Sequence, residues 1–132
     1  MPTPPDAGRS ERGTAAVEFA LVLPLVLVVA LALVQTGLLV RDRLLVEAAA
    51  RAGARAAAVQ EDPAAIRSAV LAAAPSLDDA GVDLAVTRTN VRGEPVTVSL
   101  RYEAPVRVPF VVWLFGDSVA MTTTTTARQE FG

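Results

Sequence analysis

The stretch FALVLPLVLVVALALVQTGLLV, residues 19–40, decides the fold of this chain. It contains no charged residue, and its only polar side chains are Gln35 and Thr36. An α-helix rises about 1.5 Å per residue, so this stretch would extend over about 33 Å, enough for one bilayer crossing. The rest of a 132-residue chain offers little to surround such a helix on all sides. We therefore expect a membrane-inserted helix, and not a buried core helix.

The residues on either side of this stretch divide the chain into three parts. Prolines and mixed charge in residues 1–12 predict a disordered leader. The helix is expected to begin after Gly13, and Pro24 predicts a mild kink inside it. Alanine-rich residues 41–59 continue the helix beyond the membrane. The expected parts are a leader over residues 1–13, a transmembrane helix over 14–40 and a head over 41–132.

The alanine-rich continuation has a charged face and a small-residue face. Arg43, Glu47 and Arg51 follow one another at a spacing of four residues, which permits two ion pairs on a solvated face. Gly53 lowers helix propensity, so a bend or fraying is expected there. A stripe of mostly small residues should pack against a sheet or another helix, and consists of Leu45, Ala49, Ala52, Ala56 and Val59.

The second half of the chain changes from helical to alternating patterning. Asp62 and Pro63 form an N-cap and first-turn pair, which starts a short helix through Ala74. Four strands or strand-like segments are expected after it, at residues 82–89, 96–102, 106–115 and 118–129. The sequence therefore predicts an α+β fold, with a long N-terminal helix followed by a small antiparallel sheet.

Two of these segments leave alternatives open. Pro105 and Pro109 make residues 106–108 an edge strand or an irregular connection. The apolar residues 110–115 are too few to cross a bilayer; they could pack on the helix or dip into the membrane surface, with Trp113 at the interface. The threonine run 122–126 favours an edge or surface strand, with O-glycosylation as an alternative.

Composition argues against most kinds of catalysis. The chain has 12 basic and 14 acidic residues, no cysteine and no histidine, and all its basic residues are arginine. Zinc sites with Cys or His ligands, triad hydrolysis and lysine Schiff bases are excluded, and a formal net charge of −2 argues against a nucleic-acid binder. The acidic pairs Glu61-Asp62 and Asp78-Asp79 lie among turn residues and are better explained by capping than by calcium binding. We expect no enzyme activity, no metal and no cofactor.

One carboxylate stands at the entrance to the apolar stretch. A charged group in hydrocarbon is costly, so Glu18 needs a partner. A cut after Gly13 would create an α-amine on Thr14 at the same depth as Glu18 of a neighbouring chain. This pairing would favour lateral assembly, whereas Glu18 paired with Arg12 or with the helix N-terminal amides is the simpler interpretation.

The residues around Glu18 carry a resemblance to a known family. GTAAVEF at residues 13–19, followed by ALVLPL at residues 20–25, is similar to the N-terminus of TadE-like proteins, the minor pseudopilins of tight-adherence (Flp pilus) systems. Weaker similarity continues through residues 47–58 and the closing strand, residues 120–128. Phe19 stands where the Flp processing motif has a tyrosine.

The resemblance implies a pilin-like fold and a structural role. It implies processing between Gly13 and Thr14 by a prepilin peptidase, with Glu18 acting in subunit assembly. The implied partners are that peptidase, a major pilin, other pseudopilins and the inner-membrane assembly platform. Arginines flank both ends of the apolar stretch almost equally, and we place the N-terminus in the cytoplasm and the head outside.

Two other interpretations remain. The chain could be an uncleaved single-pass anchor with an extracytoplasmic binding head. Alternatively, the apolar stretch could be a signal peptide, because Ala30-Leu31-Ala32 resembles a small-x-small cleavage site.

Overall fold

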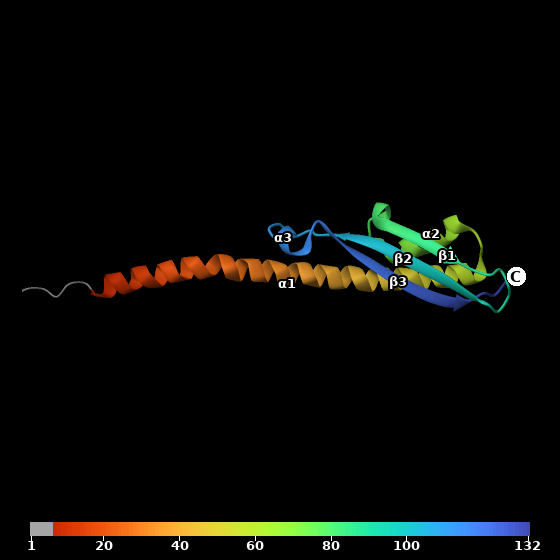
Figure 1. Ribbon diagram of the computed structural model, residues 1–132, viewed down its shortest axis with the longest axis horizontal. Coiled ribbons are helices and arrows are strands. Elements are labelled where there is room, and N and C mark those ends of the chain that lie inside the picture. Colours follow the sequence, from red (N-terminus) through yellow and green to blue (C-terminus); the bar gives the residue numbers. More distant parts are fainter. Residues whose placement is uncertain (1–6) are drawn as a thin grey trace, which may run out of the picture.

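A single long helix carries a small sheet on its C-terminal half (Figure 1). The computed structural model describes residues 7–132, with side chains from residue 12 onward. Its sheet is antiparallel with the order β1-β2-β3, which confirms the predicted α+β fold. The elements are α1 (Ala7–Val59), α2 (Pro63–Ala73), the 3-10 turn η1 (Asp79–Gly81), β1 (Val82–Thr87), β2 (Pro95–Pro105), α3 (Val112–Phe115) and β3 (Ser118–Arg128).

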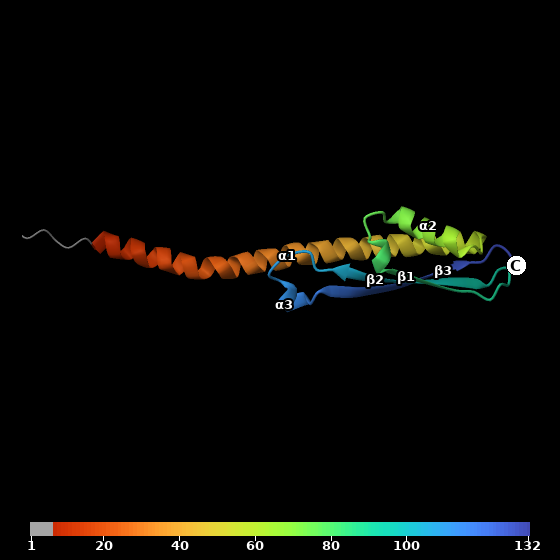
Figure 2. The same ribbon diagram turned by 90° about the horizontal axis from the view of Figure 1, so that it is seen from above.

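Helix α1 runs without interruption for 53 residues and passes through Pro24. It begins at Ala7, so the expected start after Gly13 is wrong, and so is the expected disorder over residues 7–12. Residues 7–12 contain no proline, and an existing helix extends over such residues at little cost. The part of the expected leader at residues 1–6 lies outside the described residues. Figure 2 shows α1 bending in its N-terminal half, while a kink at Pro24 itself stays a prediction.

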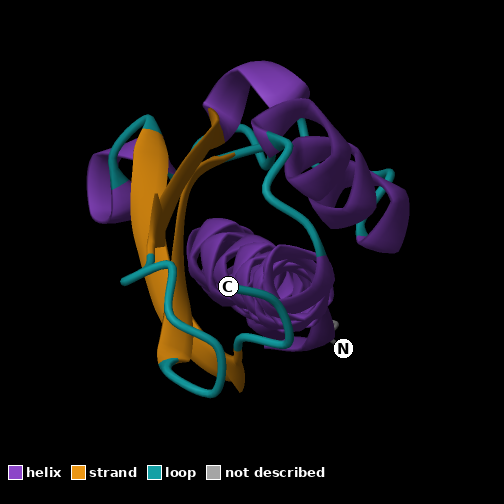
Figure 3. Ribbon diagram, turned by 90° about the vertical axis from the view of Figure 1, so that its right-hand side faces the viewer, coloured by secondary structure: helices purple, strands orange, loops and turns teal. Residues whose placement is uncertain are grey.

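Apolar side chains occupy every second position of β2, so they all lie on the face of the sheet that packs against α1. The residues of β2 facing α1 are all buried: Val96, Val98, Leu100, Tyr102 and Ala104. Register places Leu84 of β1 and Thr123 of β3 on either side of Leu100. Viewed along its length, α1 lies inside the curve of the sheet, with α2 beside it (Figure 3).

The opposite face of the sheet is polar. Thr122, Thr124 and Thr126 of the edge strand β3 are exposed, as predicted for this threonine run. Arg101 donates a 2.9 Å hydrogen bond to Glu103, and this bond lowers the pKa of the Glu103 carboxyl below its ordinary value. This face is therefore a solvated surface.

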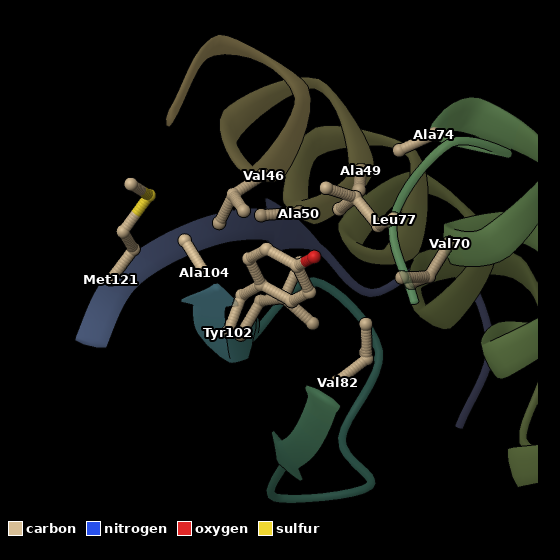
Figure 4. Close-up of a cluster of buried hydrophobic side chains, with 11 residues drawn as sticks. Val46, Ala49, Ala50, Val70, Ala74, Leu77, Val82, Tyr102, Ala104 and Met121 are labelled. Atoms are coloured by element: carbon tan, nitrogen blue, oxygen red, sulfur yellow. The ribbon is translucent and has the colours of Figure 1, made fainter. Parts of the chain in front are cut away.

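The core lies where α1, α2 and β2 meet (Figure 4). Tyr102 is fully buried in it, beside the small side chains of Ala49 and Ala50. The buried side of α1 is not the side expected from the sequence. Of the expected stripe, Ala49 is buried, but Val59 is 59% exposed. From Val46 onward, the buried residues of α1 follow a spacing of three and four, namely Val46, Ala49, Ala50, Gly53, Ala54, Ala57 and Ala58.

Gly53 is part of that buried face. A Cβ at this position would lie 2.7 Å from Cγ2 of Val70 in α2 and 3.4 Å from Cγ1 of Val98 in β2. The expected fraying at Gly53 is wrong, because the helix continues to Val59, while a bend there stays a prediction. Gly53 instead lets three elements approach one another closely.

Carboxylates cap the short elements as the sequence indicated. The Asp62 side chain accepts a 3.0 Å hydrogen bond from the Ala64 N–H, and Pro63 begins α2. Asp78 caps η1 in the same way, through the Ala80 N–H. Among the described residues, no group of three or more His, Cys, Asp or Glu side chains could hold a metal ion.

The third expected strand segment, residues 106–115, does not pair with the sheet. Its first residues form an irregular connection, which was one of the two alternatives, and α3 follows. Pro109 supplies no N–H for a ladder, and Phe110 has a φ of 65° that no strand tolerates.

Candidate assembly site on the membrane helix

The N-terminal half of α1 is covered by nothing in the described chain. Its most apolar 18-residue window has no buried residue, and the helix is long and apolar enough to cross a membrane. Phe19 is 66% and Leu21 74% exposed. The interpretation as a buried core helix is therefore excluded within this chain, and α1 has the length, composition and exposure of a single-pass membrane anchor.

The residues that the sequence singled out lie together near the start of this surface. Gly13 and Thr14 lie inside α1, about two turns from its first residue. Glu18 follows Thr14 by four residues, which places the two on the same side of the helix. A Cβ on Gly13 would meet nothing within 4 Å, so this stretch of helix is accessible from outside.

Glu18 lies exposed between apolar neighbours. Val17 and Phe19 beside it are 60% and 66% exposed. Among the described residues with side chains, no ion pair reaches Glu18. Its pairing with Arg12, the simpler interpretation from the sequence, is thus not present. A carboxylate among apolar side chains is costly in hydrocarbon unless it is paired.

The structure adds a second polar site, at the other end of the apolar stretch. The Gln35 side chain is fully buried, and its Oε1 accepts 3.0 Å hydrogen bonds from the backbone N–H groups of Arg107 and Val108. About two helical turns further along, the buried carboxylate of Asp42 accepts a 2.9 Å hydrogen bond from the Arg107 guanidinium. These contacts hold the irregular connection after β2 against α1.

Sequence reasoning missed this second site. Gln35 was visible only as an isolated polar residue, and Asp42 stood between two arginines, as on a solvated face. The sequence does not show that a loop some seventy residues away needs acceptors for its free N–H groups. Proline at both ends of residues 106–108 was the available signal, because a segment that cannot pair in a sheet must satisfy its backbone elsewhere.

The charged face of the alanine-rich segment is partly confirmed. Arg43 and Glu47 form an ion pair of 3.0 Å, and Arg43 also donates to the Thr122 carbonyl at the edge of β3. Arg51 is exposed. This face is largely solvated, and one of its arginines also fastens the edge strand to α1.

Comparison with known proteins identifies the part of the chain that carries the candidate site. The family model described as TadE-like protein matches residues 13–55, which include Gly13, Thr14, Glu18 and Pro24. No curated protein and no solved structure matches the chain significantly. The TadE-like family is a structural, pilus-associated family. The exposed apolar helix, the carboxylate at its entrance and the family match all fall in the same segment, and residues 13–55 of this chain are similar to TadE-like proteins.

Proposed function

We propose that this protein is a structural, non-enzymatic pseudopilin-like subunit of a tight-adherence (Flp) pilus or of a related type II/IV secretion assembly. The observation that carries the proposal is the position of Glu18, a carboxylate exposed on an apolar helix and without an ion pair among the described side chains. Such a group is costly in a lone membrane helix and useful in an assembly that supplies its counter-ion.

Cleavage after Gly13 supplies that counter-ion. Thr14 then becomes the first residue and carries an α-ammonium, four residues from Glu18. The two charges attract when one chain lies beside another, and water is too scarce at this depth to screen them. Pairing Thr14 of one subunit with Glu18 of the next also sets the axial register between neighbouring helices.

Cleavage requires a change in the helix at residues 13 and 14. A peptidase acts on extended backbone, whereas here this bond lies inside α1. Gly13 favours local unwinding, because glycine lowers helix stability by about 1 kcal/mol relative to alanine. The peptidase is therefore expected to open the first two turns of the helix before it cuts.

The proposed surroundings follow from this arrangement. The N-terminus faces the cytoplasm, the head lies outside the inner membrane, and the exposed apolar surface of α1 contacts lipid before assembly. Partners are the prepilin peptidase, a major pilin, other pseudopilins and the inner-membrane assembly platform. No cofactor is part of this function.

The mass of the membrane-extracted protein tests the processing step. A chain that starts at Thr14 supports the proposal. A start at Met1 or Pro2 favours the alternative, an uncleaved anchor with an extracytoplasmic binding head, and a start at Leu33 favours a signal peptide. Gly13→Val should block the cut, whereas Ala15→Val, the matched control, should leave it intact.

Glu18→Gln tests the assembly step. This variant keeps the size of the side chain and removes its charge, so membrane insertion and processing should persist while cross-linking to partner pilins falls. Glu47→Gln removes a carboxylate from the head-proximal part of the same helix and serves as the control. Unchanged cross-linking in Glu18→Gln would overturn the assembly role.

A further inference from the structure

The head carries a compact apolar tip at residues 110–114. Phe110 is 77% and Trp113 74% exposed, and Val112 and Leu114 beside them are also exposed. Among the large apolar residues exposed beyond α1 in the described chain, Val91 alone lies elsewhere. An exposed apolar cluster of this kind marks a contact surface.

The backbone holds these side chains outward. Phe110 has a φ of 65°, a conformation that is strained for a bulky residue. Val111 next to it is fully buried, and its carbonyl accepts hydrogen bonds of 2.9 and 3.1 Å from the N–H groups of Leu114 and Phe115. The chain thus uses Val111 as an inward anchor, and presents the aromatic rings on either side of it to the outside.

The tip is fastened at one level along α1. Gln35 binds the backbone at Arg107 and Val108, only two residues before Phe110. The base of the loop is closed by the Val106 N–H, which donates a 3.0 Å hydrogen bond to the Asp117 carbonyl. In Figures 1 and 2, α3 lies at the end of the head nearest the exposed half of α1.

That level corresponds to a membrane surface. Gln35 follows Thr14 by 21 residues, or about 32 Å of helix, and the hydrocarbon core of a bilayer is about 30 Å thick. With Thr14 at one boundary of the hydrocarbon, Gln35 and the tip reach the other. Tryptophan is the side chain that membrane proteins enrich at this boundary, because its ring is apolar and its N–H is polar.

We infer that the apolar tip inserts into the lipid interface of the leaflet on the side of the head, as a second membrane contact beside α1. Residues 108–116 contain no charged side chain, and Arg107 before them is neutralised by Asp42. The tip lies at the level along α1 where the helix would leave the hydrocarbon. The polar outer face of the sheet is a separate surface and does not form part of the tip. Lipid is therefore the occupant that matches both the chemistry and the level of the tip.

This contact would be a second membrane attachment beside α1, and it would favour those tilts of the helix that keep the tip in the lipid interface. The inference depends on α1 crossing the membrane and not on cleavage after Gly13, so a start at Thr14 or at Met1 leaves it standing, whereas a start at Leu33 would overturn it.

Fluorescence of the full chain in vesicles tests the inference, because Trp113 is the only tryptophan. The vesicles contain phosphatidylethanolamine and phosphatidylglycerol, with acyl chains brominated either near the headgroup or near the chain end. Trp113 should lose most of its emission with bromine near the headgroup, and much less with bromine at the chain end. It should also be shielded from aqueous iodide.

Two variants calibrate this measurement. Val91→Trp in a Trp113→Phe background moves the probe to the turn between β1 and β2, where bromolipids should not quench it. Phe19→Trp in the same background places the probe in the apolar part of α1, where bromolipids should quench it. Trp113 emission that matches the Val91→Trp probe would overturn the inference. Shielding of Trp113 that requires an added pilin subunit would also overturn it, in favour of a protein partner.

Discussion

The guanidinium of Arg107 donates a 2.9 Å hydrogen bond to a carboxylate of Asp42 whose side chain is only 1% exposed. The pair joins the loop after β2 to α1, across 65 residues of sequence. A carboxylate in this position is stable only while its partner is present, because burial without a counter-ion is costly.

Arg107→Ala should therefore destabilise the head by about 3–5 kcal/mol, the cost of a buried charge left alone. Replacing both residues, as in Asp42→Leu with Arg107→Met, should cost clearly less than the single change. Chemical unfolding of the full chain in detergent measures both. Glu47→Ala, which removes an exposed ion pair, is the control and should cost less than about 1 kcal/mol.

Gln35→Leu should loosen the connection at residues 106–110, although it makes the membrane helix more apolar. The change leaves the N–H groups of Arg107 and Val108 without this acceptor, at a cost of about 1–3 kcal/mol for the buried N–H of Val108. Hydrogen exchange of these two amides should become faster. In the control Thr36→Val, whose hydroxyl bonds only within α1, exchange should be unchanged; slow exchange in Gln35→Leu would contradict the prediction.

Gly53→Ala should lower the free energy of unfolding, whereas replacing glycine by alanine inside a helix usually raises it. The gain of about 1 kcal/mol in helix propensity is outweighed by the 2.7 Å approach to Val70, a stiff and buried side chain. Adding Val70→Ala should restore part of the loss. Gly37→Ala is the matched control, because a Cβ there meets nothing within 4 Å, and its unfolding midpoint should rise.

Asp62→Ala should destabilise α2 by about 1 kcal/mol through loss of the N-cap bond to Ala64. Asp62→Ser keeps an acceptor and should remain close to the original protein. Thermal unfolding of the full chain in detergent distinguishes the two. Equal losses in both variants would mean that the cap contributes nothing.

Features with a strong local signal could be predicted from sequence. The uncharged stretch at residues 19–40 indicated the membrane helix, and alternation at residues 96–102 indicated the inward face of β2. Asp62 followed by Pro63 indicated the start of α2. In each case adjacent residues specify the structure, so no distant contact is needed.

Features set by distant contacts could not be predicted. Alanine occupies nearly every side of α1 between residues 48 and 58, so periodicity does not show which side meets the sheet. Gly53 resembled a weak point because Val70 and Val98 lie far from it in sequence. The roles of Gln35 and Asp42 depend on a loop that folds back more than sixty residues later.

Because α1 is uninterrupted, the head should move together with the apolar half of the helix when that half tilts. With the membrane boundary at Gln35, as inferred above, the helix would extend about 36 Å beyond it to Val59, and the sheet packs along this part of α1. Transmembrane helices tilt by about 20° on average, and this angle would carry the far end of the head sideways by about 12 Å. A change in bilayer thickness of a few ångströms would thus be converted into a sweep of the whole sheet across the membrane surface.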